Sequence, residues 1–154
     1  MGTVDYASIV REGYQAFDAK DVERYSGLIL PDGKVTVVPF GMVLSFRDYF
    51  QNWAKAFPDG KCEVVTILCQ GEKVMSEFIG RGTHTGPLNG PGGVIPATGK
   101  NVEIRFAESV ELKNGKMASS RVYFDNANFM AQLGLSPLAM SKAATTTATA
   151  TPAH

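Results

Sequence analysis

Apolar residues recur every three or four positions in the first part of the chain, a spacing that predicts amphipathic helices. The first predicted helix follows Thr3 as its N-cap, and a second, shorter helix follows Asp21. A third helix follows Ser45, with Asp48 three residues later as in a capping box. Its apolar face is an aromatic stripe made of Phe46, Phe50, Trp53 and Phe57. The stripe is most simply part of the core, and the alternative is that it walls a cavity for a flat, apolar ligand.

After the second predicted helix the sequence favours extended structure. Pro31-Asp32-Gly33 predicts a turn, and the valine-rich residues 34–40 predict a strand. After Pro58-Asp59-Gly60, apolar and polar residues alternate, which is typical of strands with one buried face. This alternation covers four segments: Lys61–Cys69, Lys73–His84, Asn101–Lys113 and Lys116–Phe124.

The connections between these strands differ in length. Residues 85–100 are dense in glycine and proline and predict a loop, whereas Asn114-Gly115 predicts a tight hairpin. Helices followed by a run of antiparallel strands are typical of an α+β fold, in which the helices pack on one face of a curved sheet. We expect residues 1–135 to form this single domain. Residues 136–154 have low complexity and are expected to be disordered.

The stretch Ser119–Leu135 joins the last predicted strand to a last helix, and Asp125 lies at the junction. As the residue before a helix, Asp125 is a good N-cap, whose carboxylate accepts a backbone N–H of the first turn. The functional interpretation is a carboxylate in an apolar mouth that acts as a general acid or base. The two roles are compatible, because capping keeps the carboxylate ionised. Tyr123 falls on the same strand face, so both side chains are expected to look into the same space.

Glu108 is a lone carboxylate in an otherwise apolar strand face. An unpaired buried carboxylate is costly, so this side chain must be paired, protonated or near water in a pocket. The structural alternatives are a pairing with Arg81, Arg105 or Arg121, or an edge position near solvent. We favour a pocket, because carboxylates among apolar neighbours cluster at functional sites.

His84 ends a predicted strand beside the loop of residues 85–100. A lone histidine is more often structural than catalytic, and its place beside a glycine- and proline-rich loop only raises the odds of a functional role. Gly80 and Gly82 share its strand face, where they indicate either a bend of the sheet or room for a ligand.

Composition excludes several function classes. The 154 residues carry 15 basic and 15 acidic side chains, so no net charge draws the chain to nucleic acid or to an anionic membrane. The sequence shows no secretory signal and no apolar run long enough to span a bilayer. Cys62 and Cys69 are expected on opposite faces of one strand, as free buried thiols of a cytoplasmic protein.

The inventory of chemical groups is also limiting. No cluster has metal-ligand spacing, and neither a nucleotide-binding loop nor a nucleophile elbow occurs. Carboxylates, a histidine and tyrosines remain, and they suit acid–base chemistry on an organic molecule without a metal or cofactor.

Five short motifs, in their order along the chain, resemble those of a known family. They are GTHTG (residues 82–86), IPATGK (95–100), NGK (114–116), RVYFD (121–125) and QLG (132–134). Together they are similar to motifs of the SnoaL-like polyketide cyclases, within the nuclear-transport-factor-two-like superfamily, over residues 3–135. The resemblance implies the cone-shaped α+β fold of ketosteroid isomerases and scytalone dehydratases, with a mostly antiparallel sheet that encloses a pocket. It also implies an intramolecular aldol condensation that closes a polyketide ring, with a catalytic aspartate where Asp125 stands.

We therefore predict a cofactor-free cyclase or isomerase that acts on a hydrophobic, carbonyl-bearing metabolite. Its predicted catalytic residues are Asp125, Glu108 and His84, and its predicted substrate-binding residues are Tyr14, Phe17, Phe50, Trp53, Arg81, Arg121 and Tyr123. The alternatives are a non-catalytic module that binds a small molecule or a partner, and an epoxide hydrolase or dehydratase on the same fold. We also expect a homodimer or homotetramer, because a sheet face without helices is usually buried against a copy of itself.

Overall fold

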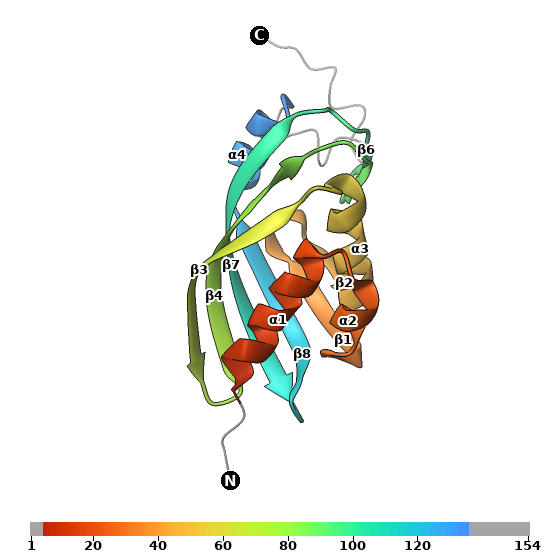
Figure 1. Ribbon diagram of the computed structural model, residues 1–154. Coiled ribbons are helices and arrows are strands. Elements are labelled where there is room, and N and C mark those ends of the chain that lie inside the picture. Colours follow the sequence, from red (N-terminus) through yellow and green to blue (C-terminus); the bar gives the residue numbers. More distant parts are fainter. Residues whose placement is uncertain (1–4, 136–154) are drawn as a thin grey trace.

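The computed structural model describes residues 5–135 (Figure 1). The predicted cap Thr3 and the predicted disordered segment 136–154 lie outside the described residues. The helical elements are α1 (Tyr6–Asp18), α2 (Val22–Ser26), the 3₁₀ turn η1 (Val38–Phe40), α3 (Phe46–Ala56) and α4 (Asn126–Gln132). The strands are β1 (Ile29–Val37), β2 (Met42–Ser45), β3 (Lys61–Gln70), β4 (Lys73–Thr83), β5 (Leu88–Gly90), β6 (Gly93–Ile95), β7 (Asn101–Lys113) and β8 (Lys116–Phe124).

Six strands form one curved sheet in the order β2-β1-β8-β7-β4-β3. All neighbouring pairs are antiparallel except β1 and β8, which are parallel. Figure 1 shows α1 crossing the sheet, with α2 and α3 on the same side. We call this side the inner face of the sheet and the opposite side the outer face. The predicted α+β fold, with N-terminal helices on a mostly antiparallel curved sheet, is confirmed.

The helices begin where short polar side chains accept their first free N–H groups. Asp21 accepts from the N–H of Arg24 at 3.0 Å, and Ser45 accepts from the N–H of Asp48 at 3.0 Å, as predicted. The N-cap of α1 is Asp5, two residues after the predicted Thr3. These caps set the residues at which α1, α2 and α3 begin.

The predicted turn at Pro31-Asp32-Gly33 is wrong, because these residues lie inside β1. The pairing of β1 with β8 shifts register between Ile29 and Lys34, so the turn-forming residues occupy an irregularity in a continuing strand. Gly33 is needed there, because a Cβ would lie 2.8 Å from the ring of Phe46. Residues 38–40 form η1 and do not continue the strand.

The short strands were not predicted from the sequence patterns. Strand β2 has four residues, too few for an alternation to be visible. The segment 85–100, predicted as a loop throughout, contains the two-stranded hairpin of β5 and β6. The side-chain amide of Asn52 ties this hairpin to α3, since it bonds both the carbonyl and the N–H of Asn89, at 3.0 and 2.9 Å.

The two cysteines are free, but the prediction of their faces is wrong. A register shift in β3 between Val64 and Thr66 reverses the alternation, so both Cys62 and Cys69 pair with inner-face positions of β4. Cys62 lies at the cavity described below, whereas Cys69 is exposed at the other end of the strand.

Candidate functional site

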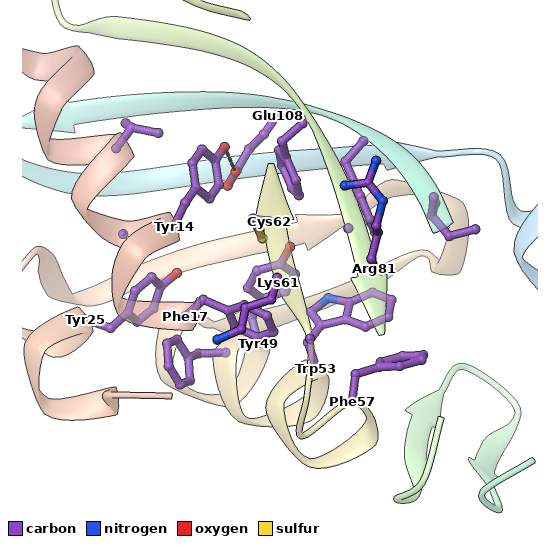
Figure 2. A pocket seen from close by; sticks show the side chains of 18 of the residues that line it. Tyr14, Phe17, Tyr25, Tyr49, Trp53, Phe57, Lys61, Cys62, Arg81 and Glu108 are labelled. Carbon is purple, nitrogen blue, oxygen red and sulfur yellow. Dashed lines mark hydrogen bonds between the residues drawn. The ribbon is translucent and has the colours of Figure 1, made fainter. Parts of the chain in front are cut away.

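A cavity of about 90 Å³ lies between the helices and the inner face of the sheet. Nearly half of its lining residues are aromatic, and these include four of the predicted substrate-binding residues: Tyr14, Phe17, Phe50 and Trp53. Six further aromatic side chains complete the wall: Tyr25, Tyr49, Phe57, Phe78, Phe106 and Phe129. Figure 2 shows the labelled members of this set surrounding one space.

Regular spacing brings these side chains together. On α1, Val10, Gly13, Tyr14 and Phe17 follow helical spacing and face the sheet. On β4 and β7, every second residue faces the helices. Gly80 makes room for the ring of Phe106, because a Cβ would lie 2.9 Å from that ring. The space above this glycine is therefore filled by the protein itself.

Glu108 is the carboxylate of the cavity. It lies on β7 with only 7 % of its surface exposed. The hydroxyl of Tyr14 donates to its Oε1 at 2.6 Å, and the hydroxyl of Ser120 donates to its Oε2 at 2.5 Å. The Tyr14 hydroxyl also bonds the hydroxyl of Ser76 at 2.6 Å. Figure 2 shows Tyr14 of α1 reaching the carboxylate of Glu108 across the cavity.

Burial perturbs the ionisation of this network. Loss of solvation raises the pKa of Glu108, and the hydrogen bonds from Ser120 and Tyr14 offset only part of that effect. Burial also raises the pKa of Tyr14 well above its usual value, and the charge of Glu108 adds to this. A carboxyl group with a raised pKa and neutral donors on both oxygens is suited to take up and return a proton.

The predicted alternative of an ion pair for Glu108 is wrong. Arg81 is paired with Glu63 and Glu103, at 2.6 and 3.0 Å, on the outer face. Arg105 is paired with Glu77 at 3.2 Å. The third candidate, Arg121, bonds the hydroxyls of Tyr123 and Ser109, and the edge position is likewise excluded because Glu108 is buried in the middle of the sheet.

Asp125 does not face the cavity, so the prediction of its orientation is wrong. Val122 and Phe124 take the inner positions of β8, and alternation therefore turns Asp125 to the outside, where it is exposed. Its carboxylate accepts the N–H of Asn128 at 3.0 Å, which makes it the N-cap of α4. The structural interpretation of this aspartate therefore holds.

His84 is buried behind the cavity wall, against the ring of Phe57 at 5.3 Å. Its Nδ1 lies 3.0 Å from the Thr98 hydroxyl and accepts the Thr98 N–H at 3.2 Å. Burial lowers the pKa of His84, which favours the neutral ring. These contacts join Thr98, which precedes β7, to the residue that follows β4. The structure therefore indicates an anchoring role for His84.

Of the three remaining predicted binding residues, two lie away from the cavity and one belongs to its lining. Arg121 and Tyr123 are exposed on the outer face. Arg81 belongs to the cavity lining, as does its strand partner Lys61, whose Nζ donates to the carbonyl of Asp18 at 2.8 Å.

Sequence reasoning did not identify the polar partners of Glu108. Ser76 lies directly opposite Glu108 in the β4–β7 pairing, and Ser120 lies on the neighbouring strand β8. Two serines in otherwise apolar inner positions were a usable signal for a polar network. Tyr25, Tyr49 and Cys62, which also line the cavity, carried no comparable signal.

Two further properties concern the described residues only. Between residues 5 and 135, no group of three or more His, Cys, Asp or Glu side chains has an arrangement that could hold a metal ion. None of the helices in this part of the chain combines the length and apolarity needed to cross a membrane.

Comparisons with known proteins agree on the fold. The family model described as SnoaL-like polyketide cyclase matches residues 8–133. A proposed SnoaL-like polyketide cyclase from Jannaschia superimposes with a TM-score of 0.73 at 15% identity, over 86% of this chain and 95% of that chain. No curated protein matches the sequence.

Two Streptomyces structures are also similar. IdmH of Streptomyces antibioticus, a proposed polyketide cyclase, has a TM-score of 0.69 at 24% identity, over 85% of this chain and 99% of that chain. AclR of Streptomyces galilaeus, a proposed hydroxylase, has a TM-score of 0.69 at 20% identity, over 84% of this chain and 95% of that chain. At these identities the likeness concerns the fold.

Proposed function

Because the chain belongs to the SnoaL-like polyketide cyclase family, we propose that it catalyses cofactor-independent acid–base chemistry on a hydrophobic, carbonyl-bearing molecule, with Glu108 as the proton-transferring group. The observation that carries this proposal is a buried carboxylate that borders the cavity and is bonded only by neutral hydroxyls. Such a group is a stronger base than an exposed carboxylate, because loss of solvation disfavours its charge.

The proposed reaction is an intramolecular aldol-type cyclisation. The Glu108 carboxylate removes a proton from the carbon next to a carbonyl, and the C–H electron pair forms an enolate. The enolate carbon attacks a second carbonyl of the same molecule, which forms the ring bond and leaves an alkoxide. Glu108 returns its proton to that alkoxide, so the product is an isomer of the substrate.

Tyr14 has two tasks in this scheme. While Glu108 is ionised, the Tyr14 hydroxyl donates to its Oε1 and holds the carboxylate in place. Once Glu108 carries the proton, the Tyr14 hydroxyl is released to donate to the substrate oxygen that gains charge. Ser76 stays within 2.6 Å of Tyr14 and supports either orientation, because a hydroxyl both donates and accepts.

The size of the cavity limits what enters it. About 90 Å³ is small beside the roughly 300–1,000 Å³ of usual ligand sites. We therefore expect only the reacting part of the substrate to enter the cavity, while the rest of the molecule stays outside it.

The test is whether Glu108 acts as a base in an apolar site. Nitrobenzisoxazole is a small, flat probe: a base removes its C–H proton, the N–O bond breaks, and the nitrile and phenolate that form are followed by absorbance. We expect Glu108→Gln to slow this ring opening by about 100- to 10,000-fold. Glu111→Gln, on the same strand but exposed, is the matched control.

The rate should rise with pH through the raised pKa of Glu108, since only the ionised form is a base. A Glu108→Gln variant that is folded and retains the rate of the unaltered protein would contradict the proposal. So would an Asp125→Asn variant that loses the rate, because Asp125 lies outside the cavity.

The proposal extends to assembly. Exposed apolar side chains gather on the outer face of the sheet, where Leu68 is paired with Met75 across β3 and β4, and Tyr123 lies on β8. Apolar side chains on an open sheet face favour its burial against a second copy of the chain, which supports a homodimer or homotetramer.

A further inference from the structure

The charge of Glu108 has no cationic partner among the described residues. Six ion pairs occur in residues 5–135, and all join side chains that are at least one-third exposed. Glu108 is in none of them, and its two donors, Tyr14 and Ser120, are neutral. Neutral hydrogen bonds offset only part of the cost of removing a carboxylate from water, so the site is short of positive charge.

The groups around this carboxylate supply no such charge. Tyr25 of α2, Tyr49 of α3 and Cys62 of β3 face the same cavity, and burial raises the pKa of each. The charge of Glu108 raises all three further, which indicates that they lie within its field. For Cys62 the pKa rises to about 12, so the thiol is neutral at physiological pH.

The two cationic residues of the cavity lining bond groups other than Glu108. Arg81 is held by Glu63 and Glu103 on the outer face. Lys61 is exposed and donates to the carbonyl of Asp18. Neither forms an ion pair or hydrogen bond with Glu108, so when Glu108 is ionised none of these side chains supplies its counter-charge.

The walls of the cavity suit a cation. Ten of its 21 lining residues are aromatic. The face of an aromatic ring carries negative potential and attracts an organic cation, most strongly where water is excluded. A neutral apolar ligand would gain from the rings but would leave Glu108 without its counter-charge.

We propose that the cavity binds a small organic cation, a tertiary or quaternary ammonium group, with Glu108 as its counter-ion and the aromatic rings as its walls. The inference goes beyond the proposed reaction, because it concerns binding and does not require Glu108 to transfer a proton. It also makes a prediction about that reaction: a bound ammonium ion occupies the carboxylate, so it should inhibit ring opening of nitrobenzisoxazole competitively.

Binding of a cation is linked to the ionisation of Glu108. The cation favours the carboxylate over the neutral acid, so below the pKa of the free protein binding releases a proton. Affinity should therefore fall about tenfold for each pH unit below that pKa and be constant above it. A neutral ligand of the same shape should show no such dependence.

Choline and 3,3-dimethylbutanol form a matched pair of probes, since they have the same shape and differ in one positive charge. Trp53, the only tryptophan, lines the cavity, so its fluorescence reports binding of either compound. We expect choline to bind about tenfold more tightly than the alcohol at a pH above the pKa of Glu108. Glu108→Gln should remove that preference, while Glu111→Gln, an exposed carboxylate on the same strand, should keep it.

Equal affinity for the two probes, or a preference for the alcohol at every pH, would overturn the inference. This comparison of the two probes uses the unaltered protein, so it can be made even if Glu108→Gln does not fold. If the unaltered protein turns over nitrobenzisoxazole but does not prefer choline to the alcohol, cation binding alone is refuted. Cation binding without turnover refutes the proposed reaction alone.

Discussion

The buried carboxylate should make the stability of the protein depend on pH in a way that one substitution removes. The pKa of Glu108 is raised above its usual value of 4.5 in the folded protein, so the folded state holds this proton at a pH where the unfolded chain releases it. Stability contributed by the protonated group is therefore fully present below about pH 4.5 and is lost as pH rises toward the folded pKa.

The magnitude follows from the linkage between proton binding and folding. A single group that is protonated in the folded state and ionised in the unfolded state lowers the free energy of unfolding by about 1.4 kcal/mol per pH unit. The side chain of the Glu108→Gln variant cannot ionise. The free energy of unfolding of this variant, minus that of the unaltered protein, should therefore increase by this slope as pH rises. The difference between the two proteins should level off above the folded pKa of Glu108.

The assay is urea unfolding at a series of pH values from about 4.5 to 8, followed by Trp53 fluorescence and by circular dichroism. The difference between the two proteins isolates Glu108, because all other titrating groups are shared. Glu111→Gln serves as the control for removing an exposed carboxylate from the same strand. If the curves of Glu108→Gln and the unaltered protein stay parallel over the whole range, the carboxylate is not perturbed and the reasoning fails.

Three further substitutions test Tyr14, the cap of α4 and the outer face of the sheet. Tyr14→Phe removes one donor to Glu108, so it should raise the pKa of that carboxyl group further and cost about 1–3 kcal/mol of unfolding free energy, as measured by urea titration. Asp125→Ala removes the N-cap of α4 and should cost about 1 kcal/mol, with the response of Trp53 fluorescence to choline unchanged. Leu68→Glu places a charge on the exposed outer face, so light scattering should show a smaller assembly than for the unaltered chain. A monomer for the unaltered chain would contradict the proposed assembly.

Long, regular patterns made much of the fold predictable. The alternation in residues 61–124 predicted β3, β4, β7 and β8 with ends within a residue of those observed. The same alternation predicted that Glu108 shares an inner face with apolar residues. It also contained the evidence against Asp125, because Val122 and Phe124 take the buried side of β8. The resemblance to a family outweighed that local signal in the prediction.

Short or irregular elements were not predictable in this way. The register irregularities in β1 and β3 leave no mark in the hydrophobic pattern. The first keeps Pro31-Asp32-Gly33 inside a strand, and the second turns Cys69 to the inner face. Strand β2 and the hairpin of β5 and β6 are held by their neighbours, so their own residues carry too little signal.

The class of fold, the faces of the long strands and the presence of one carboxylate in an apolar row follow from the order of the residues alone. That this carboxylate borders a cavity, while the one at the end of the last strand does not, follows from how the elements pack. Such packing joins residues far apart in the chain: the Tyr14 hydroxyl bonds a residue 94 positions away, and that contact exists only once α1 lies across the sheet. Local periodicity sets which way a side chain points, but what it meets is set by the packing of elements far apart in the chain.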